Sequence, residues 1–163
     1  MTTTTDPIAR LREMIGVQRG PGEWRTVSQE DIDAFAQITR DHQWIHVDVE
    51  RAKRESPFGT TIAHGNLTLS IIDGLREAIS ARDASDLEGI ALGVNMGWNR
   101  VRFPAPVPAG SRVRITGELV SVEEKGSGWW EVVDKFTVEI DGGAKPACVA
   151  ESVGRVLLRT DDS

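Results

Sequence analysis

One short segment contains the residues best suited to proton transfer. Asp41 opens the run Asp-His-Gln-Trp-Ile-His, which ends at His46, and a His64-Gly65 pair follows downstream. A carboxylate and an imidazole are common proton-transfer groups, and a backbone N–H can hold negative charge that develops on a carbonyl oxygen. All 3 histidines of the chain, the third being His42, lie in this stretch. We therefore expect any active site to be here.

The helices that must position these residues can be predicted from capping signals and apolar spacing. Asp6-Pro7 predicts the start of a short helix, which Gly16 would end. A capping box at 28–31 predicts a second helix, which delivers the chain to Asp41. The stretch from Asn66 through Ile79 is apolar on most sides of a helix, so we expect it to be the central helix, surrounded by protein.

The second half of the chain alternates apolar and polar residues with a period of two, as half-buried strands do. We expect a strand at 24–27 before the helices, then strands at 90–95, at 98–103, from Val113 with a change of face near Val120, from Trp130 to Ile140, and at 148–158. Long antiparallel strands after one buried helix predict an α+β fold, with a curved antiparallel sheet wrapped around that helix. Sheet edges are often protected by a second copy, so we expect a homodimer.

Composition limits the class of protein. At 163 residues we expect one domain, 1–163, with disordered ends at 1–5 and 160–163. The formal net charge of −6 argues against nucleic-acid binding. Cys148 is the 1 cysteine, which excludes a disulfide framework and favours the cytoplasm. No apolar run is long enough for a membrane span, and the first residues do not resemble a secretory leader.

Metal and cofactor sites are not indicated. Asp41, His42, His46 and Asp48 provide suitable ligand atoms, but no helical His-x-x-x-His pair with a third ligand is present. The turn at 126–128 has two glycines but lacks the third glycine and the following helix of a phosphate-binding loop. We expect neither a metal nor a cofactor.

The motifs resemble a known family. Asp41-x-x-x-Ile45-His46-Val47-Asp48, Phe58-Gly59 and Ile62-Ala63-His64-Gly65 resemble the signature of R-specific enoyl-CoA hydratases and MaoC-like dehydratases, which have the hot-dog fold. The segment 102–107 and Gly110-Ser111 extend the resemblance through nearly the whole chain. The sequence at 41–46 is similar to that of the branch of the family that includes nodulation protein N and actinobacterial hydratases.

Four positions depart from the family pattern. Arg40 stands where the common motif has glycine, Gln43 replaces an asparagine and Trp44 replaces a proline. Gln43 keeps an amide that can orient water, whereas Trp44 alters the bulk of the loop. Asp73 stands where some members have a serine on the central helix. These departures leave the acyl chain length open.

The resemblance implies syn addition of water to trans-2-enoyl-CoA, giving the (R)-3-hydroxyacyl thioester. Asp41 and His46 would hold one water; which of them is the base stays open, because coupled groups share their titration. The backbone N–H of Gly65 would face the thioester oxygen, helped by the helix dipole. Ile62 and His64 would bind or orient the substrate, His64 mainly by fixing the loop.

Two other functions stay open. A thioesterase on the same fold would use Asp73 or Glu77 as base or nucleophile. A non-catalytic subunit would bind an acyl thioester and pair with a homologous partner. Whether the acyl carrier is CoA or acyl-carrier protein also stays open.

Overall fold

The computed structural model describes residues 6–79 and 89–159. Its helices are α1 (Pro7–Glu13), α2 (Gln29–Thr39), α3 (Trp44–Val47), α4 (Val49–Glu55), α5 (Gly65–Ser70) and α6 (Ile72–Arg76). Its strands are β1 (Gln18–Arg19), β2 (Arg25–Thr26), β3 (Ile90–Arg102), β4 (Arg112–Gly126), β5 (Trp129–Ile140) and β6 (Cys148–Leu158). The ends expected to be disordered, 1–5 and 160–163, lie outside the described residues.

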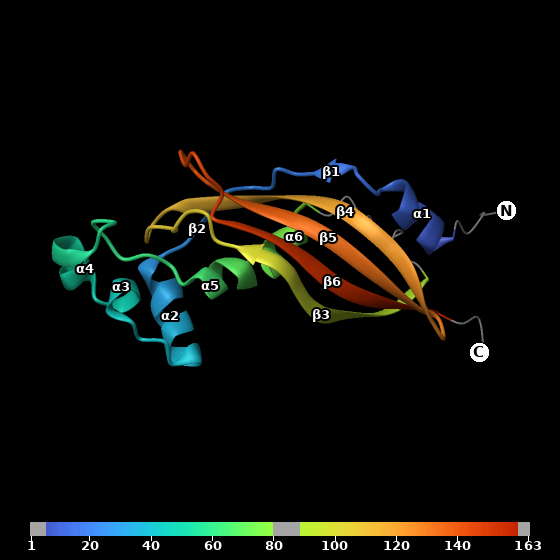
Figure 1. Cartoon of the computed structure of the whole chain (residues 1–163), viewed down its shortest axis with the longest axis horizontal. Coiled ribbons are helices and arrows are strands. Elements are labelled where there is room, and N and C mark those ends of the chain that lie inside the picture. Colours follow the sequence, from blue (N-terminus) through green and yellow to red (C-terminus); the bar gives the residue numbers. More distant parts are fainter. Residues whose placement is uncertain (1–5, 80–88, 160–163) are drawn as a thin grey trace.

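The long strands form one curved antiparallel sheet, with α5 and α6 against one face and α2, α3 and α4 grouped beyond one end (Figure 1). The strand order is β1-β4-β5-β6-β3, and β2 also pairs with β4. The expected change of face near Val120 is confirmed, because the β4–β5 register shifts between Leu119 and Ser121. The two strands expected at 90–95 and 98–103 form the single strand β3, with a register shift between Asn95 and Gly97.

The two N-terminal capping predictions are confirmed. The side chain of Asp6 accepts a hydrogen bond from the Ile8 N–H at 3.0 Å. Ser28 and Asp31 form a reciprocal capping box at the start of α2. The end of α1 differs from the prediction: the helix stops at Glu13, before Gly16, because its last turn tightens.

The central helix lies where expected but is not one continuous element. α5 ends at Ser70. The next residue, Ile71, has a ψ of −14°, which departs from the α-helical value, and α6 follows it and ends at Arg76. Apolar side chains of this segment pack into the largest buried cluster, together with apolar residues of β4, β5 and β6. Members of that cluster include Leu67, Ile71, Ile72, Ile115, Phe136, Val138 and Ala150. The α+β prediction, a curved sheet around a buried helix, is therefore confirmed.

A second apolar cluster lies under α1, where Ile8 and Leu11 pack with Val132 and residues of β4. Because alternate residues of a strand share a face, Asp134 lies on β5 between Val132 of this cluster and Phe136 of the first. Asp134 is 5% exposed and forms an ion pair with the equally buried Arg19 of β1. A buried ion pair thus separates the two apolar clusters.

In the described part of the chain, no helix has the length and apolar character that crossing a membrane requires.

Candidate active site

Asp41 lies just beyond the end of α2. Arg40, the residue after α2, has a left-handed backbone with φ of 64°. Glycine adopts that conformation without strain, which gives a physical reason for the glycine of the family motif at this position. The Asp41 carboxylate accepts a hydrogen bond from the Gln43 N–H at 3.3 Å, and its side chain is 54% exposed. The carboxylate is therefore oriented by the loop but accessible to a ligand.

His46 lies in α3 and is 7% exposed. Its Nδ1–H donates a hydrogen bond to the carbonyl oxygen of Ile62 at 2.7 Å. In the neutral ring this bond leaves the lone pair on Nε2. Burial, and secondarily the neighbouring His64, lower the pKa of His46 below its ordinary value of 6.5, while the bond to Ile62 and the Asp41 charge partly offset this. The neutral, proton-accepting form is thereby favoured.

Two residues that the sequence did not single out hold the backbone around His46. Gln29, at the start of α2, donates a side-chain hydrogen bond to the His46 carbonyl oxygen at 2.8 Å. The hydroxyl of Thr61, which is fully buried, donates to the amide oxygen of Gln29. Neither residue carries a local signal for this role, because each acts through a partner distant in the sequence.

His64 is 3% exposed and connects the parts of the site. Its Nε2–H donates to the carbonyl oxygen of Asp41 at 3.0 Å, and its ring stacks on that of His46 with centroids 3.8 Å apart. Phe35 of α2 packs on the other side, at 5.1 Å between centroids. The Nδ1 atom of His64 is buried and has no hydrogen-bond partner among the described residues.

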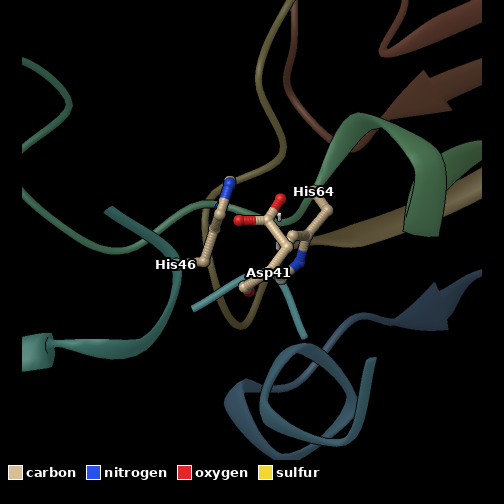
Figure 2. Close-up of side chains that lie close together, drawn as sticks. All are labelled: Asp41, His46 and His64. Atoms are coloured by element: carbon tan, nitrogen blue, oxygen red, sulfur yellow. Dashed lines mark hydrogen bonds and ion pairs between the residues drawn. The ribbon is translucent and has the colours of Figure 1, made fainter. Parts of the chain in front are cut away.

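Figure 2 shows the Asp41 side chain beside the two imidazole rings. A carboxylate oxygen of Asp41, a ring nitrogen of His46 and a ring nitrogen of His64 all lie within 4.8 Å of one another. A water that makes two hydrogen bonds of about 2.8 Å can bridge groups up to about 5.6 Å apart. Among the described residues no direct hydrogen bond joins the Asp41 carboxylate to the His46 ring. The spacing therefore suits a bridging water.

Asp41, His46 and His64 also have the atom types that bind metals. They are not the set of possible ligands named from the sequence, since His42 and Asp48 are exposed and lie outside this cluster. A metal needs a lone pair on the ligating nitrogen. The His64 atom nearest to the Asp41 carboxylate is Nε2, at 4.0 Å, and this atom carries the proton donated to the Asp41 carbonyl. In this arrangement the Nε2 atom of His64 is therefore not free to bind a metal.

Beside His46 lies a mostly apolar cavity of about 270 Å³. Its lining includes His46, Ile62, Gly65, Thr68, Phe103 and Val107. Gly65 is the first residue of α5, and the N-cap residue His64 provides no side-chain cap, so the first N–H groups of this helix are available to a ligand. The sequence thus brings His46, Ile62 and Gly65 to one cavity, whereas Gln43 is exposed and its side chain is not part of the lining.

A second cavity, of about 370 Å³, lies at the far end of the central helix segment. It is lined by Asp73, Arg76 and Glu77 of that segment and by polar residues of the sheet, including Asp134 and Ser152. Asp73 forms an ion pair with Arg76 at 3.3 Å. The two carboxylates proposed for a thioesterase therefore lie apart from the imidazole cluster.

Comparisons with known proteins agree with this description. The model of the family described as "MaoC like domain" matches residues 11–139. The chain is 49% identical over 154 residues to 3-hydroxyacyl-thioester dehydratase Z of Mycobacterium tuberculosis, covering 94% of this chain and 98% of that protein. It is 43% identical over 155 residues to nodulation protein N of Rhizobium leguminosarum bv. viciae, covering 95% and 94% of the two chains.

A solved structure described as the (R)-hydratase from A. caviae involved in PHA biosynthesis superposes with a TM-score of 0.63 at 21% identity, covering 83% of this chain and 95% of that chain. The sheet with its buried helix is thus the hot-dog fold of these dehydratases. The chain belongs to the MaoC-like family, as its motifs indicated.

Proposed function

We propose that this protein is an (R)-specific enoyl-CoA hydratase that also runs in reverse as a 3-hydroxyacyl-thioester dehydratase. The observation that carries the proposal is the close spacing of two proton-transfer groups beside an apolar cavity: a carboxylate oxygen of Asp41 and a ring nitrogen of His46 lie within 4.8 Å of each other, and His46 lines the cavity. The name of the mycobacterial relative supports the substrate class, a 3-hydroxyacyl thioester.

In the proposed hydration, one water donates a hydrogen bond to each acceptor and turns its oxygen toward C3 of the enoyl group. As the O–C3 bond forms, the π electrons move onto the thioester oxygen, and one water proton passes to the Asp41–His46 pair. The pair then delivers a proton to C2 while the enolate collapses. Because the same pair serves both carbons from one side, the addition is syn.

The remaining steps are assigned to neighbouring groups. The Gly65 N–H is proposed to hold the developing oxyanion, because Gly65 lines the cavity and its N–H has no hydrogen-bond partner among the residues that the structure describes. The α5 helix is short, so the local N–H contributes more than the helix dipole. His64 is proposed to hold the Asp41 backbone against the stacked His46 ring. Gln43 is proposed to orient water or substrate from the exposed loop.

The test is the reaction of purified protein with crotonyl-CoA. Loss of the enoyl absorbance without release of free thiol is the expected result. Release of free thiol would replace the proposal by a thioesterase, and binding without reaction would leave a non-catalytic acyl-thioester subunit. Repeating the assay with crotonyl-acyl-carrier protein identifies the preferred carrier.

Substitution of the two acceptors tests the assignment of the pair. Asp41→Asn and His46→Gln should each lower kcat/KM on the order of a hundredfold or more, because each removes a proton-transfer group. His42→Gln is the matched control: this histidine belongs to the same motif but is exposed and outside the cluster, so its variant should keep the wild-type rate. Folded Asp41 and His46 variants with wild-type rates would show that the pair is wrongly assigned.

We also propose that the protein is a homodimer joined along β3. This strand ends the sheet order, and in the described residues its one strand partner is β6. Its exposed side chains include Leu92, Val94 and Met96, at 50%, 40% and 51% exposure, next to its unpaired edge. Light scattering should give a dimer that Val94→Lys disrupts, whereas Val17→Lys, at a comparably exposed valine, should not. A monomer, or a dimer insensitive to Val94→Lys, would overturn this interface.

A further inference from the structure

Phe103 is a large apolar side chain that stays 44% exposed on the wall of the His46 cavity. Its ring lies against the backbone of Gly65: a Cβ atom built on Gly65 would be 2.9 Å from two ring carbons. The family motif includes glycine at this position, and here any side chain would collide with Phe103. The ring therefore covers the space directly beside the proposed oxyanion donor.

The backbone that carries the Phe103 ring is constrained on both sides. Phe103 follows β3, whose register with β6 shifts between Asn99 and Arg102, and Pro104 then restricts Phe103 to an extended backbone. Further on, the Ala63 N–H donates to the Val107 carbonyl at 2.8 Å. The connection that carries Phe103 is thereby tied to the residues immediately before His64 and Gly65.

We propose that Phe103 determines specificity at the carbons next to the thioester. This inference rests on the proposed hydratase function. A thioester whose oxygen bonds the Gly65 N–H has its carbonyl carbon close to that donor, and in the proposed pose C2, rather than the sulfur, lies beside the Phe103 ring. A hydrogen at C2 fits there, whereas a methyl group meets the ring. The protein therefore selects unbranched 2-enoyl thioesters and rejects 2-methyl-branched ones.

The experiment compares crotonyl-CoA with tigloyl-CoA, its 2-methyl analogue, in wild type and in Phe103→Ala. The wild type should strongly prefer crotonyl-CoA. In the variant the tigloyl-to-crotonyl ratio of kcat/KM should rise by about 10–200-fold, the usual effect of one methylene-sized group in an apolar pocket. A ratio of specificity constants is the informative quantity, because general damage to the site lowers both values together.

Phe58→Ala is the matched control, because Phe58 is 45% exposed and is not part of the cavity lining. It should leave the ratio at the wild-type value. Phe103→Leu serves if the alanine variant does not fold, since leucine also removes the flat ring, and circular dichroism confirms the fold of each variant. A folded Phe103 variant with an unchanged ratio would overturn the proposal.

Failure of the hydratase proposal itself gives a different result, namely no hydration of crotonyl-CoA by the wild type. In that case the dissociation constants of crotonyl-CoA and tigloyl-CoA are measured by calorimetry. A gain in relative tigloyl-CoA affinity in Phe103→Ala still supports the ring as the selective wall. Equal relative affinities in both proteins overturn it.

Discussion

The two ends of the central helix segment carry ionisable groups in opposite arrangements. At the α5 end, His46 lines an apolar cavity, and its Nδ1–H bond to Ile62 leaves the lone pair on Nε2; among the described residues one backbone N–H, that of Gln43, donates to the Asp41 carboxylate. At the α6 end, Asp73 is paired with Arg76, and Asp134 is paired with Arg19. Charged groups that already have partners stabilise the fold, whereas proton transfer needs a free lone pair. The contrast explains why the chemistry is expected at one end only.

The largest effect should come from breaking the buried pair at the α6 end. Arg19→Met removes the cation and leaves Asp134 buried, which should lower the free energy of unfolding by about 3–5 kcal/mol. Urea unfolding measures this loss, and the rate per folded molecule should not change. Arg19→Met combined with Asp134→Leu is the control and should recover most of the stability. If the single and the double variant lose the same free energy of unfolding, packing rather than charge explains the effect.

An intermediate effect should appear in the pH dependence at the α5 end. The pKa of His46 is lowered from 6.5 in the folded protein, so as pH falls below 6.5 the unfolded chain takes up this proton first. Stability should then decrease between 6.5 and the lowered folded value, by at most about 1.4 kcal/mol per pH unit for one proton. Above 6.5 this contribution does not vary with pH.

His46→Gln provides the comparison, because it removes the titrating ring. Urea unfolding of both proteins on either side of pH 6.5 should show a steeper decline for the wild type. Parallel declines would indicate that other groups cause the pH dependence.

The smallest effect should come from Asp73→Asn. Asp73 is about half-exposed, and among the described residues its ion-pair partner is Arg76 of the same helix segment, so loss of its charge should change stability by no more than about 0.5 kcal/mol. The hydration rate should stay within about twofold of wild type. A large loss of activity would instead give the α6 cavity a part in the reaction and reopen the thioesterase alternative.

Local rules account for the parts of the fold that the sequence predicted well. The caps at Asp6 and Ser28 depend on residues next to them in the sequence. The last strand could be predicted from its alternation of apolar and polar residues alone. The interruption at Ile71 could not be predicted, because neither a proline nor a glycine stands at this position to mark a break in the helix. The split expected in β3 was wrong because a register shift interrupts the alternation without ending the strand.

The site was predictable as a set of residues but not as a set of contacts. The motif around Asp41 and His46 located the cluster, and the structure brings His64 into it. Ile62 was expected to bind or orient the substrate, and the structure shows a contact that was not expected, in which its carbonyl oxygen accepts the hydrogen bond from His46 Nδ1–H. Such backbone contacts cannot be recognised from residue types. The same is true of the hydrogen bonds from Gln29 to His46 and from Thr61 to Gln29, whose partners are distant in the sequence.

The segments 61–63 and 107–109 run side by side, joined by the Ala63–Val107 and Ala109–Thr61 backbone hydrogen bonds at 2.8 and 2.9 Å. One of these segments leads directly into Gly65 and the other follows closely after Phe103. Lengthening or shortening either loop would therefore move Gly65 and Phe103 together, whereas exchanging the side chain at 103 changes one of them alone.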